Sequence, residues 1–193
     1  MHIIQVGANK GNTDNDPVWK LCQENMPASL DWKIDLIEPN PKAVEICREN
    51  YRVAGFTNVV VFCCGISDTH EELDLFIDND VPGNEGSQHA SMNRSHLHKL
   101  GHSDQVISTR RVTCYPLHEF FHESVVDILQ IDTEGYDAKV LLGCDFTGLT
   151  IKKIQFEHIH ISPEEFAAVV SKLEEIGYKR TYFGPEDVVY ELN

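Results

Sequence analysis

Short apolar runs alternate with amphipathic stretches over most of the chain. The runs that predict buried strands cover residues 3–6, 34–38, 59–64, 125–132 and 151–156. Helical spacing of apolar residues follows each of the first two runs, and we expect these helices to begin at Pro17 and Pro41. A strand, a helix and a second strand in this succession favour parallel pairing with right-handed crossovers.

The second half of the chain continues this alternation and ends differently. Further helices are predicted at residues 117–121, after residues 133–135 through Val140 and Leu141 to Gly143, and from the capping box Ser162–Glu165 to Gly177. The last two apolar runs, 178–183 and 188–192, flank a Gly-Pro turn and predict an antiparallel hairpin. We therefore expect a single α/β domain over residues 1–193, with a Rossmann-like, doubly wound and mostly parallel sheet.

Residues 71–110 depart from the pattern. Leu73–Ile77 alternates between apolar and polar positions and predicts an edge strand. Residues 78–110 lack apolar periodicity and are rich in Gly, Asn, Ser and His, so we predict a lid or substrate loop over the sheet's carboxyl edge. Arg94 is hypothesised to hold an acidic acceptor. The histidines of this segment fit either a zinc cluster or a solvated, substrate-facing surface, and we favour the second; they are His89, His96, His98 and His102.

Composition excludes several partners. The formal net charge is −15, and no cluster of Lys or Arg offers a face for nucleic acid or an anionic membrane. No apolar run approaches the roughly 20 residues needed to cross a bilayer, and no basic segment precedes the first strand at Ile3. We expect a cytoplasmic protein whose six cysteines are buried thiols. The early start of the first strand predicts a minimal domain or a site that a partner subunit covers; the oligomeric state is not predicted.

The first strand runs into a turn with two glycines, Gly7 and Gly11. Their spacing differs from G-x-G-x-x-G, the pattern that packs a pyrophosphate against a helix, which argues against NAD or FAD. Glu38 ends the second strand, where a carboxylate in nucleotide-binding α/β folds accepts from both ribose hydroxyls. A cofactor without phosphates, held through ribose, adenine and an amino-acid tail, fits these features better. S-adenosylmethionine (SAM) is such a cofactor.

Four segments together resemble the FkbM family of class I SAM-dependent methyltransferases, most of which act on oxygen. They are Gly7-Ala8-Asn9-Lys10-Gly11, Glu38-Pro39-Asn40, Asp132-Thr133-Glu134-Gly135-Tyr136 and Phe156-Glu157-His158. The resemblance covers nearly the whole chain and implies a seven-stranded sheet of order 3-2-1-4-5-7-6. It also implies that the glycine turn approaches the methionine part of SAM, Glu38 the ribose, residues 65–68 the adenine, and Asp132 the sulfonium and amino end.

The predicted cofactor-binding residues are Gln5, Gly7, Ala8, Asn9, Gly11, Glu38, Pro39, Gly65, Ser67, Asp68 and Asp132. Two positions depart from the family. Gln5 and Ile66 stand where many relatives have an acidic residue, so Gln5 cannot supply a charge and adenine would be read through backbone groups, Ser67 or Asp68. These departures keep open a non-catalytic binding domain as an alternative.

Methyl transfer requires alignment of acceptor, methyl group and sulfur, and a hydroxyl acceptor must also lose its proton. The candidate bases are Glu134, Glu157 and His158, which follow the two central strands 125–132 and 151–156. Glu157 is favoured, because a carboxylate that ends a buried strand needs a partner or a purpose. These three residues and Asp132 would also suit Mg²⁺ or Mn²⁺, but no spacing demands an ion and we predict no metal.

The sequence thus predicts a SAM-dependent methyltransferase that acts on a hydroxyl of a small molecule or sugar. A non-catalytic Rossmann-like binding or interaction domain and, less favoured, an NAD-dependent oxidoreductase remain as alternatives.

Overall fold

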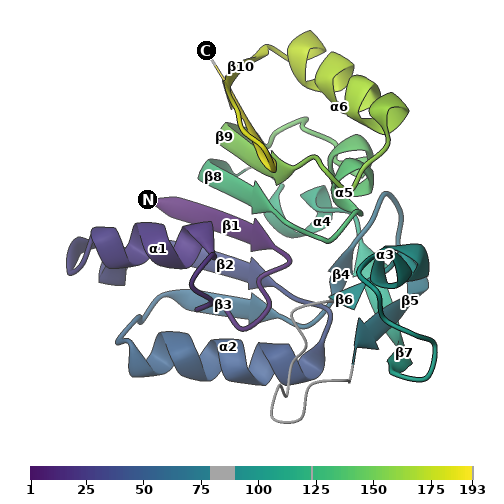
Figure 1. The fold of residues 1–193 in the computed structure, drawn as a ribbon. Helices are drawn as coiled ribbons and strands as arrows, with labels where there is room; N and C mark the ends of the chain where they lie inside the picture. Colours follow the sequence, from purple (N-terminus) through teal and green to yellow (C-terminus); the bar gives the residue numbers. More distant parts are fainter. Residues whose placement is uncertain (79–89, 123, 193) are drawn as a thin grey trace.

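A sheet of seven strands forms the centre of the molecule (Figure 1). The computed structural model describes residues 1–78, 90–122 and 124–192. The strands of this sheet are β1 (His2–Val6), β2 (Lys33–Ile37), β3 (Val59–Phe62), β8 (Val125–Ile131), β9 (Thr150–Glu157), β10 (Tyr178–Phe183) and β11 (Asp187–Leu192). Their order across the sheet is β3-β2-β1-β8-β9-β11-β10, which in positions along the chain is 3-2-1-4-5-7-6. Pairing is parallel from β3 to β9 and antiparallel where β11 meets β9 and β10, so the sheet is mixed.

Helices cover both faces of this sheet. They are α1 (Pro17–Glu24), the 3-10 helix η1 (Ala28–Asp31), α2 (Pro41–Val53), α4 (His118–Phe121), α5 (Asp137–Gly143) and α6 (Pro163–Glu175). Ile3 packs in one apolar cluster with side chains of α1 and α2, whereas its neighbour Ile4 packs in another with α4, α5 and α6. Successive side chains of a strand point to opposite faces, so this division is that of a doubly wound sheet. Among the helices of the described residues, none has the length and apolarity to cross a bilayer.

The predicted helix starts are confirmed by their caps. The side chains of Asp16 and Asn40 accept from backbone N–H groups of Trp19 and Lys42, and a proline follows each cap. Ser162 and Glu165 form both bonds of the capping box. These side chains occupy N–H groups that a helix leaves without an internal partner, which is why the sequence located the starts to the residue.

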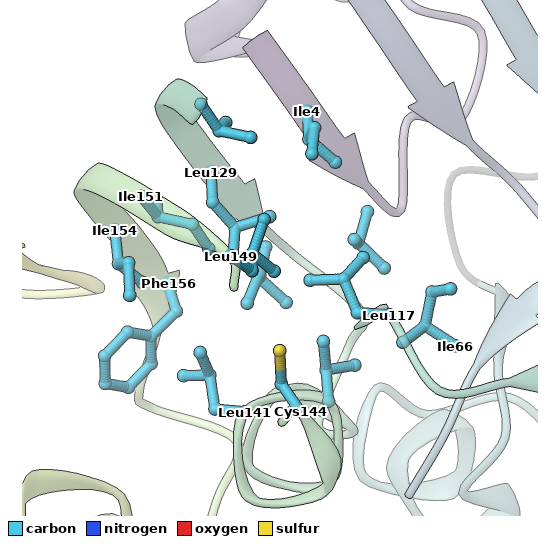
Figure 2. Packing of buried hydrophobic residues seen from close by; sticks show 14 of the residues in the cluster. Ile4, Ile66, Leu117, Leu129, Leu141, Cys144, Leu149, Ile151, Ile154 and Phe156 are labelled. Atoms are coloured by element: carbon cyan, nitrogen blue, oxygen red, sulfur yellow. The ribbon is translucent and has the colours of Figure 1, made fainter. Parts of the chain in front are cut away.

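The larger core lies between the sheet and α5. Figure 2 shows Leu141 and Cys144 pointing from the end of α5 toward the strands, where Leu129, Ile154 and Phe156 face them. All five side chains are buried. These buried contacts fix α5 against β8 and β9, and so they also hold the loops that follow these two strands.

A second sheet, absent from the sequence prediction, lies beyond the carboxyl ends of β1, β2 and β3 (Figure 1). It contains β4 (Gly65–Ile66), β5 (Glu71–Asp78), β6 (Ala90–Ser91) and β7 (Ile107–Tyr115), in the order β4-β7-β5-β6, and α3 (Arg94–Lys99) follows β6. Two expectations were wrong. The predicted edge strand is internal, between β7 and β6, and residues 90–110 of the predicted loop carry β6, α3 and the start of β7. The first part of β7 is exposed and polar, so apolar periodicity could not show it.

Two smaller expectations also need correction. The run 59–64 is not a fully buried strand, because β3 is an edge strand of the large sheet and Val60 is 47% exposed. Five of the cysteines are buried free thiols as predicted, but Cys63 is exposed.

Gly7 is required where β1 meets β8. Its φ of 84° lies in the left-handed region, and a Cβ at this position would overlap the carbonyl oxygen of Asp132. Gly101 has a similar φ of 91°, but a Cβ there would meet no atom within 4 Å. A residue with a side chain would therefore have a strained backbone at either position, but only at Gly7 would its Cβ also clash with another atom.

We expect Gly7→Ala to destabilise the protein well beyond Gly101→Ala. The left-handed backbone alone costs an alanine about 1–2 kcal/mol, and only Gly7→Ala must also push β1 away from Asp132. Urea unfolding of the two variants and the wild type measures the difference. Equal losses of unfolding free energy would show that the contact between the turn and Asp132 is not a constraint.

Candidate functional site

A cavity opens at the carboxyl ends of β1, β2 and β8. It has a volume of about 1030 Å³, counting its open mouth. Most of its walls come from the turn after β1, the end of β2, the start of the small sheet and the turn after β8. The lining residues are Gln5–Asn9, Thr13, Asn15–Pro17, Ile37–Pro39, Cys64–Ile66, Leu75, Ala90–Met92, Asp132–Glu134 and Tyr136. The carboxyl edge is where open α/β sheets bind ligands, because the strand ends and their loops leave a crevice there.

The backbone N–H groups of the turn after β1 already have acceptors within the protein. The N–H groups of Gly7 and Ala8 both donate to the carbonyl oxygen of Ile37, and that of Asn9 donates to Glu38. The N–H of Gly11 donates to Ala8 within the turn. These four amides are therefore occupied within the protein and do not form a cradle for an anion.

Gly11 is not among the cavity-lining residues, contrary to its predicted contact with the cofactor. A Cβ at Gly11 would meet Cys47 and Tyr51, both of which lie on α2. The glycine at this position allows the turn to pack against α2, which is a structural requirement of the fold.

Glu38 lies in the cavity wall with both carboxylate oxygens held. Its Oε2 accepts from the N–H of Asn9 at 2.9 Å, and its Oε1 accepts from the N–H of Asn40 at 2.7 Å. Burial raises the pKa of this carboxyl to about 7, although the two backbone donors oppose the shift. Each oxygen retains acceptor capacity, so the group is fixed in orientation and still available to a ligand.

Asp16 supplies the acid that Gln5 lacks. The Gln5 side chain is buried and its Nε2 donates to Oδ2 of Asp16 at 3.0 Å, while Oδ1 of Asp16 caps α1. Burial raises the pKa of Asp16. Both residues line the cavity. The carboxylate at this point of the wall therefore comes from the start of α1 and not from β1. The sequence showed Asp16 only as a helix cap.

Asp132 follows β8 and lines the same cavity. Burial raises its pKa to about 8, and the carboxylate of Asp137 adds to the shift. Asp137 is itself buried and accepts from the hydroxyl and the N–H of Thr133. Asp132 therefore stands among acids, and among the described residues no positive side chain pairs with it, so it gains from any cation that enters the cavity.

The cavity wall is acidic as a whole. Asp16, Glu38, Asp132 and Glu134 line it, and among the described residues no Lys or Arg does. Two buried acceptors in the wall, Oε1 of Gln5 and Oδ1 of Asn9, receive no hydrogen bond from the described residues. The wall thus has an excess of acceptors, which favours a ligand with cationic and hydrogen-bond-donating groups and disfavours a polyphosphate.

The residues predicted to surround adenine divide into two groups. Gly65 and Ile66 line the cavity, and so do Cys64 and Pro39, of which Pro39 was predicted to bind the cofactor without a stated part. Ser67 and Asp68 do not: the Ser67 hydroxyl donates to Glu71 and Asp68, and Asp68 pairs with Lys139. Their predicted place beside the adenine is therefore not supported by their positions.

Of the predicted catalytic residues, Glu134 alone lines the cavity. His158 is turned toward the C-terminal hairpin, where its Nε2 lies 3.1 Å from the carbonyl oxygen of Gly184 and its ring stacks on Phe183. Glu157 lies beside the cavity, and burial raises its pKa to about 9, with Asp132 adding to the shift. Asp132, Glu134, Glu157 and His158 therefore do not converge on one ion, because His158 points away from the other three.

Two other histidines, His96 and His160, lie beside Glu134. The Nε2 atoms of His96 and His160 lie 2.8 Å and 3.8 Å from Oε2 of Glu134, and their rings are 4.3 Å apart between centroids. His96 comes from α3 and His160 from the loop after β9. The backbone of Glu134 has a φ of 56°, which is uncommon outside glycine and directs this side chain.

A zinc cluster of the histidines in residues 89–102, the alternative that we did not favour, does not form among the described residues. His98 pairs with Asp104 and His102 with Asp78, whereas His89 lies outside the described residues. Arg94 also pairs with Asp104 and lies over the ring of Phe76, and it does not line the cavity. The hypothesis that Arg94 holds an acidic acceptor is not supported by this position.

Sequence reasoning missed several residues of the site. Thr13, Asn15, Ser91, Met92 and Tyr136 line the cavity, and His160 stands beside Glu134. Ser91 carries a structural signal, because its hydroxyl donates to the carbonyl oxygen of Glu134 at 2.8 Å. No local pattern marks it, since the partner is 43 residues away.

One solved methyltransferase structure shares this fold, and a second was also found by comparison. A solved structure of methyltransferase FkbM from Methylobacillus flagellatus KT aligns with a TM-score of 0.62 and 13% identity, over 98% of this chain and 43% of that one. A precorrin-6y C5,15-methyltransferase from Geobacter metallireducens GS-15 aligns with a TM-score of 0.49 and 11% identity, over 100% of this chain and 80% of that one. The chain therefore spans less than half the length of the FkbM structure. No curated protein matches it.

The model of the methyltransferase FkbM domain matches residues 5–180, which include the turn after β1, Glu38, the cavity-lining turn after β8 and the start of the first hairpin strand. The chain belongs to the FkbM methyltransferase family.

Proposed function

We propose that this chain is a SAM-dependent methyltransferase that transfers the methyl group to a hydroxyl of a small molecule or sugar. The observation that carries the proposal is the acidic wall of the cavity, which lacks Lys and Arg among the described residues and holds Glu38 at the end of β2. SAM has a sulfonium, an ammonium and two ribose hydroxyls, so it supplies the cations and donors that this wall lacks. Family membership supports methyl transfer as the reaction.

The residues present fit this cofactor. Glu38 would accept from the ribose hydroxyls, since its two oxygens are fixed by Asn9 and Asn40 and keep free acceptor capacity. Asp16 and Asp132 would face the cationic end. The unsatisfied oxygens of Gln5 and Asn9 would accept from the ammonium. When bound, SAM supplies a methyl group activated by its sulfonium.

This chain's own part in the reaction is positioning and removal of a proton. We place the acceptor hydroxyl beside Glu134, because Glu134 lines the cavity at the turn after β8. Ser91 ties β6 to this turn, so the segment from β6 through α3 forms the wall next to the acceptor. We propose that this segment, part of the predicted lid, excludes water and sets the shape of the acceptor.

The alternatives have weaker support. An NAD-dependent oxidoreductase needs donors for a pyrophosphate, but the amides of Gly7, Ala8, Asn9 and Gly11 are occupied. A non-catalytic domain was kept open by the missing acids at positions 5 and 66. Asp16 weakens the argument from position 5, because its carboxylate contacts Gln5 in the cavity wall.

We expect SAM to bind the wild type and Glu38→Ala to weaken binding at least about 100-fold. Loss of two ribose hydrogen bonds to a charged acceptor removes roughly 3 kcal/mol or more. Isothermal titration calorimetry measures the dissociation constants. Glu45→Ala is the matched control, because Glu45 is an exposed acid on α2, immediately after the same strand and turn.

Two outcomes would contradict the proposal. One is absence of SAM binding to a wild type whose fold circular dichroism confirms. The other is equal binding by Glu38→Ala and Glu45→Ala, which would remove the ribose contact.

The affinity for SAM is expected to rise with pH up to about pH 8, most steeply below pH 7. Burial raises the pKa of Glu38 to about 7, so at lower pH the free protein holds a neutral carboxyl whose proton occupies an acceptor site. Below this pKa each unit of pH costs about tenfold in affinity if binding requires the ionised form. The raised pKa of Asp132 acts in the same direction. Calorimetry from about pH 5.5 to pH 8 tests this, and a constant affinity over that range would contradict it.

A further inference from the structure

Three donor atoms from distant parts of the chain converge next to the cavity. His96 lies on α3, Glu134 follows β8, and His160 follows β9. One ligand atom from each residue lies within 4.8 Å of the other two. The donors are thus brought together by the fold, and no sequence motif joins them.

The local structure holds these donors in place. The hydroxyl of Ser91 donates to the carbonyl oxygen of Glu134 and accepts from the N–H of Asn93, whose side chain caps α3. This chain of contacts links the helix that carries His96 to the turn that carries Glu134. On the other side, a Cβ at Gly135 would approach the carbonyl oxygen of His160 to 3.2 Å, so the glycine lets the two loops pack closely.

The distances are close to those of ligands on one ion, and the shorter of the two lies just below the usual range. Bonds of 2.0–2.2 Å from a metal place its ligand atoms about 3–4 Å apart. The two Nε2 atoms lie 2.8 Å and 3.8 Å from the same oxygen of Glu134. His96 is buried and the other two are partly buried, so the donors are shielded from most of the competing solvent.

The donor chemistry selects the class of ion. Imidazole suits Zn²⁺, Fe²⁺, Co²⁺ and similar ions, whereas Mg²⁺ and Ca²⁺ prefer oxygen ligands alone. Two histidines and one carboxylate are the protein ligands of many catalytic sites, which keep at least one position open for water or substrate. Oε2 of Glu157 lies 3.7 Å from Nε2 of His160 and receives no hydrogen bond from the described residues, so a further oxygen stands near the cluster.

We propose that His96, Glu134 and His160 bind a divalent transition-metal ion beside the cofactor cavity, and that the acceptor hydroxyl coordinates it. This inference rests on the proposed function and deepens it. A bound cation lowers the pKa of a coordinating hydroxyl, as it does that of water. The O–H bond then breaks, the proton passes to solvent, and the oxygen attacks the methyl carbon with the electron pair that it keeps. The bond between the methyl carbon and sulfur breaks, and S-adenosylhomocysteine leaves with that electron pair. Glu134 thus acts as a ligand, and the acceptor hydroxyl needs no separate base.

Titration of the chelator-treated full chain with Co²⁺ tests this site, because the ligand-field absorption of Co²⁺ reports its coordination directly. We expect saturable binding by the wild type. His160→Ala should weaken it by more than the roughly 10- to 100-fold that loss of an outer partner costs. The matched control is His98→Ala, since His98 lies on the same helix as His96 but is paired with Asp104. This control should bind Co²⁺ as the wild type does.

Absence of Co²⁺ binding to the wild type would overturn the inference, and so would equal affinities of His160→Ala and the wild type. A SAM titration in the presence of chelator separates failure of the metal site from failure of the proposed function. SAM binding should persist there, since the proposed cofactor contacts include neither His96 nor His160. Circular dichroism of His160→Ala verifies its fold, and Glu134→Gln, which keeps the shape and removes the charge, provides a second variant expected to lose Co²⁺.

Discussion

The parallel pairing of β1 with β2 and β8 is the constraint on which the site depends. Ile4 lies opposite both Asp35 of β2 and Leu129 of β8, so the three strands end at one level. Gly7 then allows the turn after β1 to pass against Asp132. This arrangement brings Glu38 and Asp132 to one cavity, because parallel strands present their carboxyl ends at the same edge.

The resulting concentration of acids is unfavourable for the free protein. Burial raises the pKa values of Asp16, Glu38 and Asp132, which means that the fold disfavours their ionised forms. Each of these groups binds protons more tightly in the folded than in the unfolded chain, so ionisation with rising pH lowers stability. A cationic ligand reverses this effect. The site is therefore one in which stability is given up locally for binding, as is common at functional sites.

The sequence predicts those features that depend on neighbours along the chain. The strands of the large sheet, the capped helix starts at Asp16, Asn40 and Ser162, and the family follow from local patterns and quoted motifs. Features that depend on distant pairing escaped it. The small sheet forms because β5 pairs with β7, whose first residues are polar.

The site shows the same division. Glu38 was identified from its place after a predicted strand, and Asp132 from the resemblance. Asp16 looked like a helix cap alone, since its contact with Gln5 depends on how α1 packs on β1. His160 carried no signal, whereas His158 was a candidate because it follows a central strand; the antiparallel hairpin turns His158 away.

The most direct test of this account is a crystal structure of the protein with S-adenosylhomocysteine, the product that SAM leaves behind. The account predicts the ligand in the cavity, with the ribose hydroxyls on the Glu38 carboxylate and the amino-acid end among Gln5, Asp16 and Asp132. A ligand bound elsewhere, or one whose ribose does not contact Glu38, would contradict the assignment of the cavity as the cofactor site.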